Sequence, residues 1–161
     1  MLLGCWLIFF ALLTMFFSHH LEHKKNPNRV VDGRITKSGD RIVTLYRNDR
    51  NQYLSAGKVN GQAVTYLIDT GATGISIPTS VAKKAGLRTG RSGSAATANG
   101  FVTIYETRVD KLELGPIVVR NVPAHINPGL TDNQILLGIS VLRKLDIRIK
   151  GRKMTLRQPA R

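Results

Sequence analysis

The stretch VTYLIDTGATGISIP, residues 64–78, places a single carboxylate, Asp69, between an apolar strand-like run and a turn of small residues. These small residues leave room for backbone amides to approach the carboxylate oxygens, which suits an acid that is held rigidly and reached by substrate. The same Asp-Thr-Gly tripeptide also suits a turn aspartate that bonds to its own backbone. On the tripeptide alone the turn aspartate is favoured, so the decision depends on the rest of the chain.

Beyond about residue 42 the chain predicts mainly β-structure. Short apolar or alternating segments are separated by turn residues, and Asn60-Gly61 is a dipeptide favoured in type I′ hairpins. A short helix is expected to begin with Thr79 or Ser80 as its N-cap and to end at Gly86. Because the connections are too short for repeated βαβ crossovers, one mainly β domain is predicted.

The composition is strongly basic, with 24 Lys and Arg residues against 10 Asp and Glu residues and a formal net charge of +14. This bias indicates partners such as anionic lipid, nucleic acid or an acidic polypeptide. Residues 143–161, RKLDIRIKGRKMTLRQPAR, contain many of the cations, which alternate with apolar residues as in a half-buried strand. No aromatic stacking platform accompanies them, so a solvated strand face resting on anionic lipid is favoured over nucleic-acid binding.

The N-terminus is apolar over residues 1–17 and contains no charged side chain, which is close to the shortest length that spans a bilayer as a helix. We expect a transmembrane anchor over residues 1–18. A cleaved signal peptide is the alternative, although a basic leading region and a small-residue cleavage site are missing. The cations that follow favour a cytoplasmic domain by the positive-inside rule.

A polar juxtamembrane linker is expected over residues 19–39. His19 and His23 have the spacing of two ligands on one helix face, but only Glu22 accompanies them. The single cysteine, Cys5, offers no disulfide framework and no thiolate metal site. No metal and no cofactor is therefore predicted.

Two motifs together resemble the retropepsin-like aspartic proteases. YLIDTGATGISIP, residues 66–78, resembles their active-site segment, and ILLGISVL, residues 135–142, resembles the apolar-apolar-glycine landmark that packs beneath it. The resemblance is strongest to the bacterial, membrane-anchored, single-domain branch. It implies a mainly β, closed-barrel protease domain over residues 40–158, a basic tail end at 159–161, and a single-pass protein of the bacterial inner membrane with the side of the domain left open.

The resemblance also implies the residues of the site. Asp69 is the expected catalytic residue, and its loop is supported by Thr70, Gly71 and Ala72. Many relatives carry a hydroxyl residue at the Ala72 position, so its loss implies a pair that is protonated more easily and activity nearer neutral pH. The residues expected to pack beneath the loop are Leu136, Leu137 and Gly138, and those of the flap that closes over substrate are Thr97, Ala98, Asn99 and Gly100.

Aspartic proteases as a class need two carboxylates that share one proton. This chain has one Asp-Thr-Gly, so we expect a homodimer in which each copy contributes Asp69 to an endopeptidase site for peptide or protein substrates. The alternative is a protease-fold module that dimerises or binds peptides without cutting them. His125 could imitate a catalytic base, but no nucleophile motif accompanies it, and a core or rim histidine is favoured.

Overall fold

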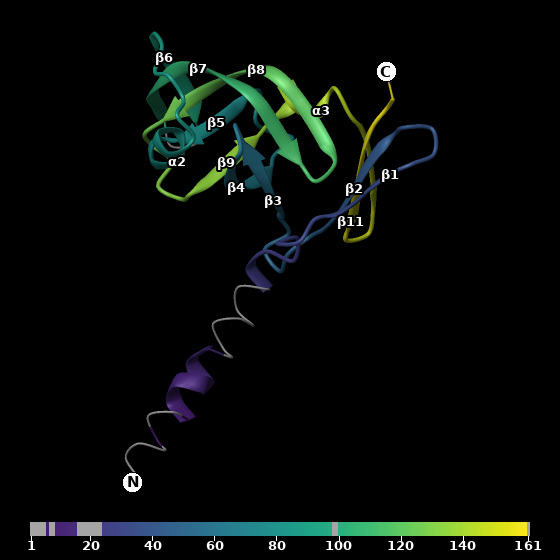
Figure 1. The fold of residues 1–161 in the computed structure, drawn as a ribbon. Coiled ribbons are helices and arrows are strands. Elements are labelled where there is room, and N and C mark those ends of the chain that lie inside the picture. Colours follow the sequence, from purple (N-terminus) through teal and green to yellow (C-terminus); the bar gives the residue numbers. More distant parts are fainter. Residues whose placement is uncertain (1–5, 7–8, 16–23, 98–99, 161) are drawn as a thin grey trace.

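The computed structural model describes Trp6 and residues 9–15, 24–97 and 100–160 (Figure 1). Trp6 and residues 9–15 are helical. In this described part of the chain, no helix combines the length and the apolar character needed to cross a membrane. The transmembrane helix expected over residues 1–18 is therefore not supported, and much of that segment lies outside the described residues.

The domain is built almost entirely from β-strands that form two sheets. A four-stranded sheet has the order β1-β2-β11-β10, and a seven-stranded sheet has the order β3-β4-β9-β5-β8-β7-β6. The elements are β1 (Asp32–Ile35), β2 (Arg41–Tyr46), β3 (Tyr53–Val59), β4 (Gln62–Ile68), β5 (Ile75–Pro78), α2 (Thr79–Lys84), β6 (Ser92–Thr97), β7 (Gly100–Leu114), β8 (Ile117–Asn127), β9 (Gln134–Leu137), α3 (Ile139–Leu142), β10 (Asp146–Lys150) and β11 (Lys153–Gln158).

The larger sheet closes on itself, because β3 pairs with β4 on one side and with β7 on the other. Lys58 and Val59 of β3 lie opposite Glu113 and Leu112 of β7. β6 is left outside this ring as the second strand of the hairpin that it forms with β7. The closed mainly β fold is thus confirmed, and closure removes most of the unpaired strand edges.

The barrel interior is filled by buried aliphatic side chains together with Tyr53 and Tyr66. The Tyr66 hydroxyl donates to the Lys58 carbonyl at 2.6 Å, which gives the buried polar atom a partner. Burial also raises the pKa of this hydroxyl, so Tyr66 stays protonated. Burying a large apolar side chain stabilises a fold by about 1.5–3 kcal/mol, and most strands contribute such residues. They include Val59, Ile75, Ile77, Val109, Leu112, Leu114, Ile117, Val122, Ile135 and Leu137.

Two local predictions can be compared with the structure. The hairpin at Asn60 and Gly61 is confirmed, since φ is 49° and 84° at these residues and both lie in the left-handed region. The helix start differs, because α2 begins at Thr79 and Pro78 occupies the N-cap position with no side-chain cap bond. The Ser80 hydroxyl instead donates to the side-chain oxygen of Asn133 at 2.8 Å, so a tertiary contact has replaced the local cap.

The four-stranded sheet has one apolar and one charged face. Val43 and Leu45 lie opposite Leu156 and Met154, and all four are buried. The same face continues onto β10, yet Ile147 and Ile149 there are 37% and 55% exposed. β1 lies within the range expected to be a linker, where it pairs with β2.

The segment before β1 is fixed to the domain by Asn28. Its side chain is 2% exposed and donates to the carbonyls of Tyr46 and Leu54, while its own oxygen accepts the Tyr46 N–H at 2.7 Å. The Ala56 N–H also donates to the Asn28 carbonyl. A buried amide with all these bonds satisfied fixes the chain that leads into β1 in one position.

Candidate active site

The two motifs of the sequence meet in the barrel wall, where β9 lies between β4 and β5. Tyr66, Leu67 and Ile68 of β4 run parallel to Ile135, Leu136 and Leu137 of β9. On the other side, β9 pairs antiparallel with β5 through Leu137 and Leu136. The loop that joins β4 to β5 therefore projects from the end of β9, and it carries Asp69.

Asp69 is held by backbone bonds on both sides of its side chain. Its N–H donates to the Leu137 carbonyl at 3.1 Å, and its Oδ1 accepts the Gly71 N–H at 2.8 Å. The second bond is the local turn bond that the tripeptide predicts. The carboxylate is half-buried and its neighbours Thr70 and Gly71 are exposed, so the turn bond and an accessible acid are found together.

Gly138 allows the closest backbone approach beneath the loop. A Cβ at this position would lie 2.3 Å from the Gly74 carbonyl oxygen and 2.4 Å from the Ala72 carbonyl oxygen. Backbone atoms cannot move away as a flexible side chain can, so only glycine fits. Leu137 is buried, Leu136 is half-buried, and both lie on β9; the structure thus brings Leu136, Leu137 and Gly138 together with the Asp69 loop.

Two residues that the sequence analysis did not single out complete this support. Ile139 donates its N–H to the Ala72 carbonyl at 2.8 Å, and Ser140 donates its N–H to the Thr73 carbonyl at 3.0 Å. These amides belong to the first turn of α3, where backbone N–H groups have no partner within a helix. The available signal was the position of this short helix directly after the apolar-apolar-glycine landmark.

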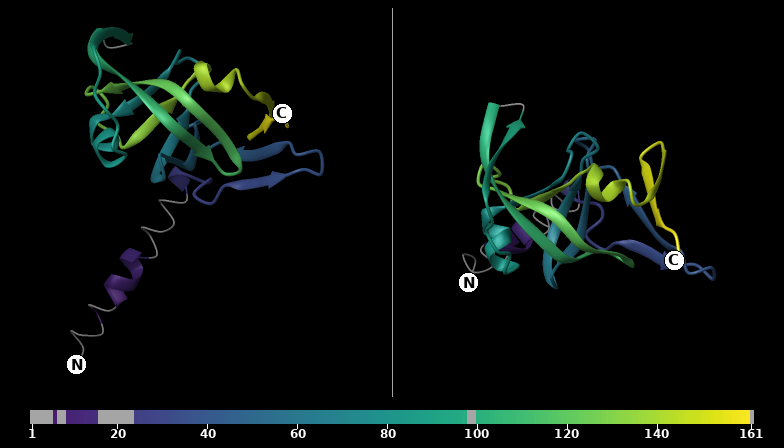
Figure 2. Two further views of the ribbon diagram at one scale, coloured as in Figure 1. Left: turned by 45° about the horizontal axis from the view of Figure 1, so that its top comes forward. Right: turned by 90° about the horizontal axis from the view of Figure 1, so that it is seen from above.

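The expected flap coincides with the hairpin of β6 and β7. Thr97 and Gly100 face each other at its tip, and the Thr97 hydroxyl donates to the Gly100 carbonyl at 2.7 Å. Ala98 and Asn99 lie outside the described residues. Phe101 next to the tip is 85% exposed, and Figure 2 shows the hairpin projecting from the barrel.

The other ionisable candidates do not form a second site. His125 is half-buried on β8 opposite Ser76 and Glu106, and it approaches Gly74 at the end of the Asp69 loop. Glu113 bonds to Lys111, which lowers the pKa of the glutamate. Within the described ranges, no group of three or more His, Cys, Asp or Glu side chains could hold a metal ion. His19 and His23 lie outside them.

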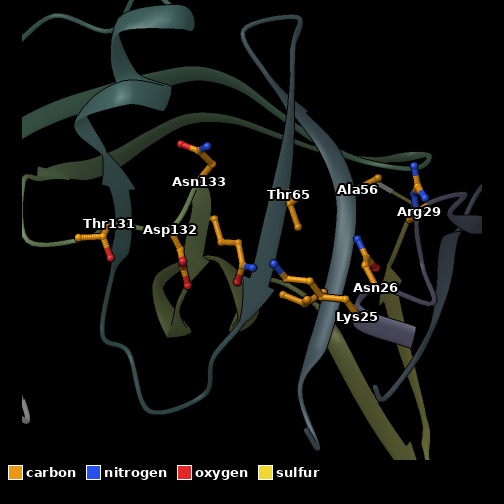
Figure 3. A pocket seen from close by; sticks show the side chains of 10 residues that line it. Lys25, Asn26, Arg29, Ala56, Thr65, Thr131, Asp132 and Asn133 are labelled. Atoms are coloured by element: carbon orange, nitrogen blue, oxygen red, sulfur yellow. The ribbon is translucent and has the colours of Figure 1, made fainter. Parts of the chain in front are cut away.

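A separate polar groove of about 540 Å³ opens on another part of the surface (Figure 3). Lys25, Asn26 and Arg29 line one wall, and Asp132 and Asn133 lie on the opposite wall. Asp69 and its loop are not among the lining residues. This groove therefore belongs to the surface beside the N-terminal segment.

Comparisons with known proteins agree with this arrangement. Residues 55–144 match the family described as "gag-polyprotein putative aspartyl protease". The chain belongs to this aspartyl protease family. The matched range contains the Asp69 loop, the β6–β7 hairpin, β9 and α3, so it includes the elements that build the loop and its support.

Two individual relatives extend the match over most of the aspartyl protease chain. A protein of Sinorhizobium sp., called "Uncharacterized protein in cobV 5′region", is 26% identical over 156 residues, which cover 90% of this chain and 67% of the relative. The crystal structure of a retropepsin-like aspartic protease from Rickettsia conorii matches with a TM-score of 0.63 and 21% identity, over 81% of this chain and 95% of that one. The second match shows that the fold is retropepsin-like.

Proposed function

We propose that this protein is an aspartic endopeptidase whose active site forms when two copies each contribute Asp69. The observation that carries the proposal is an accessible carboxylate on a loop that β9 and α3 hold by backbone bonds. A site of this kind keeps its acid in place without relying on flexible side chains, as general acid–base chemistry requires. Each chain supplies only half of the necessary pair.

The paired carboxylates divide the chemistry between them. Because two carboxyl groups in hydrogen-bonding proximity cannot both be ionised, the pair holds one proton. The ionised Asp69 takes a proton from a bound water, which attacks the scissile carbonyl carbon, while the protonated Asp69 donates to the carbonyl oxygen. The tetrahedral intermediate collapses when a proton reaches the leaving amine. The Thr70 hydroxyls bond across the two-fold axis of the dimer and keep the two loops rigid. The Gly71 N–H donates to the Asp69 carboxylate oxygen.

Exposed isoleucines, of which Ile139 lies at the loop, support the dimer. Ile139, whose N–H bonds to the loop, is 41% exposed, and Ile147 and Ile149 follow on β10. β10 is an edge strand of its sheet, with no partner beyond it among the described strands. In an isologous dimer both copies present the same patch, so burial of these isoleucines would bring the two loops together at the axis.

Two finer properties are part of the proposal. Ala72 supplies no side-chain hydroxyl to an outer carboxylate oxygen, which favours protonation of the pair and activity nearer neutral pH. The uncharged residues 1–17 attach the protein to a membrane, with the bacterial inner membrane as the proposed location. The β6–β7 hairpin, including residues 97–100, closes over a bound peptide.

The full chain assayed on a diverse peptide library, beside Asp69→Asn, tests the function. We expect cleavage by the wild type and a loss of at least about 10³-fold in kcat/KM for the variant, since both acid and base roles are removed. Peptide binding by the wild type without cleavage would instead identify a non-catalytic module. Sedimentation of the same sample tests the pairing, because a strict monomer that cleaves peptides would contradict the shared site.

A further inference from the structure

Three segments that are distant in sequence meet at one end of the domain. The Asn48 side chain, which is 4% exposed, donates to the Lys25 carbonyl at 2.9 Å. The Arg47 N–H donates to the Arg152 carbonyl, and the Arg152 guanidinium donates back to the Arg47 carbonyl at 2.9 Å. The chain at Lys25, the loop 47–52 and the β10–β11 turn are thereby joined.

This junction concentrates positive charge, and we call it the basic end. Asp49 is an acid within it and is paired with Arg152 at 3.3 Å. Both partners are 63% exposed, so that ion pair is weak and leaves the excess of positive charge intact. The basic end comprises Lys24, Lys25, Arg29, Arg47, Arg50, Lys150, Arg152 and Lys153, of which only Arg47 is not exposed.

The basic end also includes the residues that follow the apolar N-terminal segment in the sequence. That segment ends at Phe17, seven positions before Lys24 in the sequence. At Asn28 the chain is fixed by hydrogen bonds to Tyr46 and Leu54. Figure 1 shows the described residues just before β1 on the side of the domain where β11 and the turn before it lie, away from the β6–β7 hairpin. The cations are therefore held beside the segment proposed to enter the membrane.

Two neighbouring features suit a membrane–water interface. Tyr46 is 47% exposed and lies opposite Lys153 in the sheet, and exposed tyrosines are enriched at the level of lipid headgroups. The polar groove lined by Lys25 and Arg29 opens beside the same segment (Figure 3). Together they give the basic end an aromatic side chain and a recess with hydrogen-bonding groups.

We propose that the basic end docks onto the headgroups of an anionic lipid bilayer, the same bilayer that holds residues 1–17. The inference rests on the membrane attachment proposed above and is independent of catalysis. Each Lys or Arg near an anionic surface contributes about 1 kcal/mol, or roughly a fivefold change in the docked population. Docking fixes the orientation of the domain, so that the β6–β7 hairpin faces away from the bilayer and the protease acts on peptides that extend from the surface.

The test uses the full chain, in which Cys5→Ser removes the native thiol and Gln52→Cys provides a labelling site in loop 47–52. The fluorophore-labelled protein is reconstituted into vesicles that carry a nitroxide on their lipid headgroups. We expect strong quenching when the phosphatidylcholine vesicles contain phosphatidylglycerol, little quenching without it, and release by high salt. A label at Ala96→Cys on the β6–β7 hairpin should remain unquenched in both cases.

Reversing the charge of selected cations tests whether the basic end is the part of the protein that docks onto the lipid. The triple variant Arg50→Glu, Lys150→Glu and Lys153→Glu should lower the docked-to-free ratio by at least about a hundredfold, since three attractions become repulsions. A matched control reverses Lys83, Lys84 and Arg88, which carry the same total charge outside the basic end. Equal circular dichroism and Tm values for the two variants would exclude misfolding as the cause.

The outcomes separate the possible failures. A chain that does not float with either type of vesicle would overturn both the anchor and the docking. A chain that floats with both, but shows equal quenching with and without phosphatidylglycerol or equal loss in the two triple variants, would overturn the docking alone. Loss of quenching on anionic vesicles at a lower concentration of single-stranded DNA than of soluble phosphatidylglycerol headgroup would reassign the basic end to nucleic acid. Peptide cleavage in detergent reports on the protease site separately.

Discussion

The barrel around β9 and the four-stranded sheet are both built from short strands, but they differ in how tightly their residues are packed. At the barrel, a Cβ added to Gly138 would lie within 2.4 Å of two carbonyl oxygens, so there is no space for a methyl group. In the sheet, every residue of β1 and β10 is exposed. The difference indicates that the site depends on backbone packing that tolerates no added atom, whereas the sheet keeps surfaces available for contacts with other molecules.

The largest effect should come from adding one methyl group to the tight region. Gly138→Ala would place its Cβ within 2.4 Å of two backbone oxygens, so the Asp69 loop or β9 must move. We expect a loss of more than about 4 kcal/mol in the free energy of unfolding and no peptide cleavage. Gly93→Ala is the control, because the nearest atom to its Cβ lies 4.0 Å away. Equal denaturant midpoints for the two variants would contradict the proposed difference.

Removing the asparagine that joins the N-terminal segment to the domain should have the next largest effect. Asn28→Ala leaves the Tyr46 N–H and the Tyr46 and Leu54 carbonyls without their buried partner. We expect a cost of about 2–4 kcal/mol in denaturant unfolding. Asn28→Asp keeps an acceptor for the Tyr46 N–H but loses both donated bonds, and it introduces a buried charge. A loss of only a few tenths of a kcal/mol in the free energy of unfolding for Asn28→Ala would show that the chain before β1 is loosely attached to the domain.

Polar substitution on the exposed sheet edge should weaken association rather than folding. Ile147→Ser with Ile149→Ser removes apolar area that is partly exposed in the single chain and buried in the proposed dimer. The dimer dissociation constant should rise about 10- to 100-fold, measured by sedimentation, with little change in the unfolding of the monomer. Ile35→Ser on the opposite edge strand, where Ile35 is 63% exposed, is the matched control. An equal effect at both edges would place the interface elsewhere.

The smallest effect should come from Asp40, whose carboxylate bonds to Arg157 and Ala160 beside the four-stranded sheet. The Ala160 N–H and then the Arg157 guanidinium hold the pKa of the Asp40 carboxyl below its usual value. A lowered folded-state pKa stabilises the fold above the unfolded value of about 3.9, and this contribution is lost as pH falls through the folded pKa. Asp40→Asn should therefore lower Tm slightly at neutral pH, and the gap should close in acid. A gap that persists at the lowest pH would assign the effect to something other than ionisation.

The sequence was most informative where short-range rules decide the backbone. The Asn60-Gly61 turn and the strand leading to Asp69 could be predicted, because each depends on the local conformations that a few residues allow. The apolar-apolar-glycine landmark was found through the family resemblance instead, since Gly138 is required by the approach of distant carbonyls. The start of α2 could not be predicted, since Ser80 bonds to Asn133 from a distant loop. Local capping preferences carry no information on such a contact.

The N-terminal side was the least predictable. Asn28 falls within the predicted polar linker of residues 19–39, but burial and bonds to Tyr46 and Leu54 give it a structural role. Likewise, Asp32–Ile35 lacks the apolar alternation of a strand and pairs with β2 nonetheless. In both cases the partner lies elsewhere in the chain, and a pattern confined to the segment could not reveal it.

The insertion of β9 between β4 and β5 also determines when the Asp69 loop can receive its support during synthesis. The carbonyls of Ala72 and Thr73 receive their hydrogen bonds from Ile139 and Ser140, which are synthesised long after the loop itself. Closing so large a loop is slow, and a chain still emerging from the ribosome lacks these partners. If the chain cleaves peptides as proposed, the order of translation keeps the site of the nascent polypeptide incomplete until nearly the whole domain has been made.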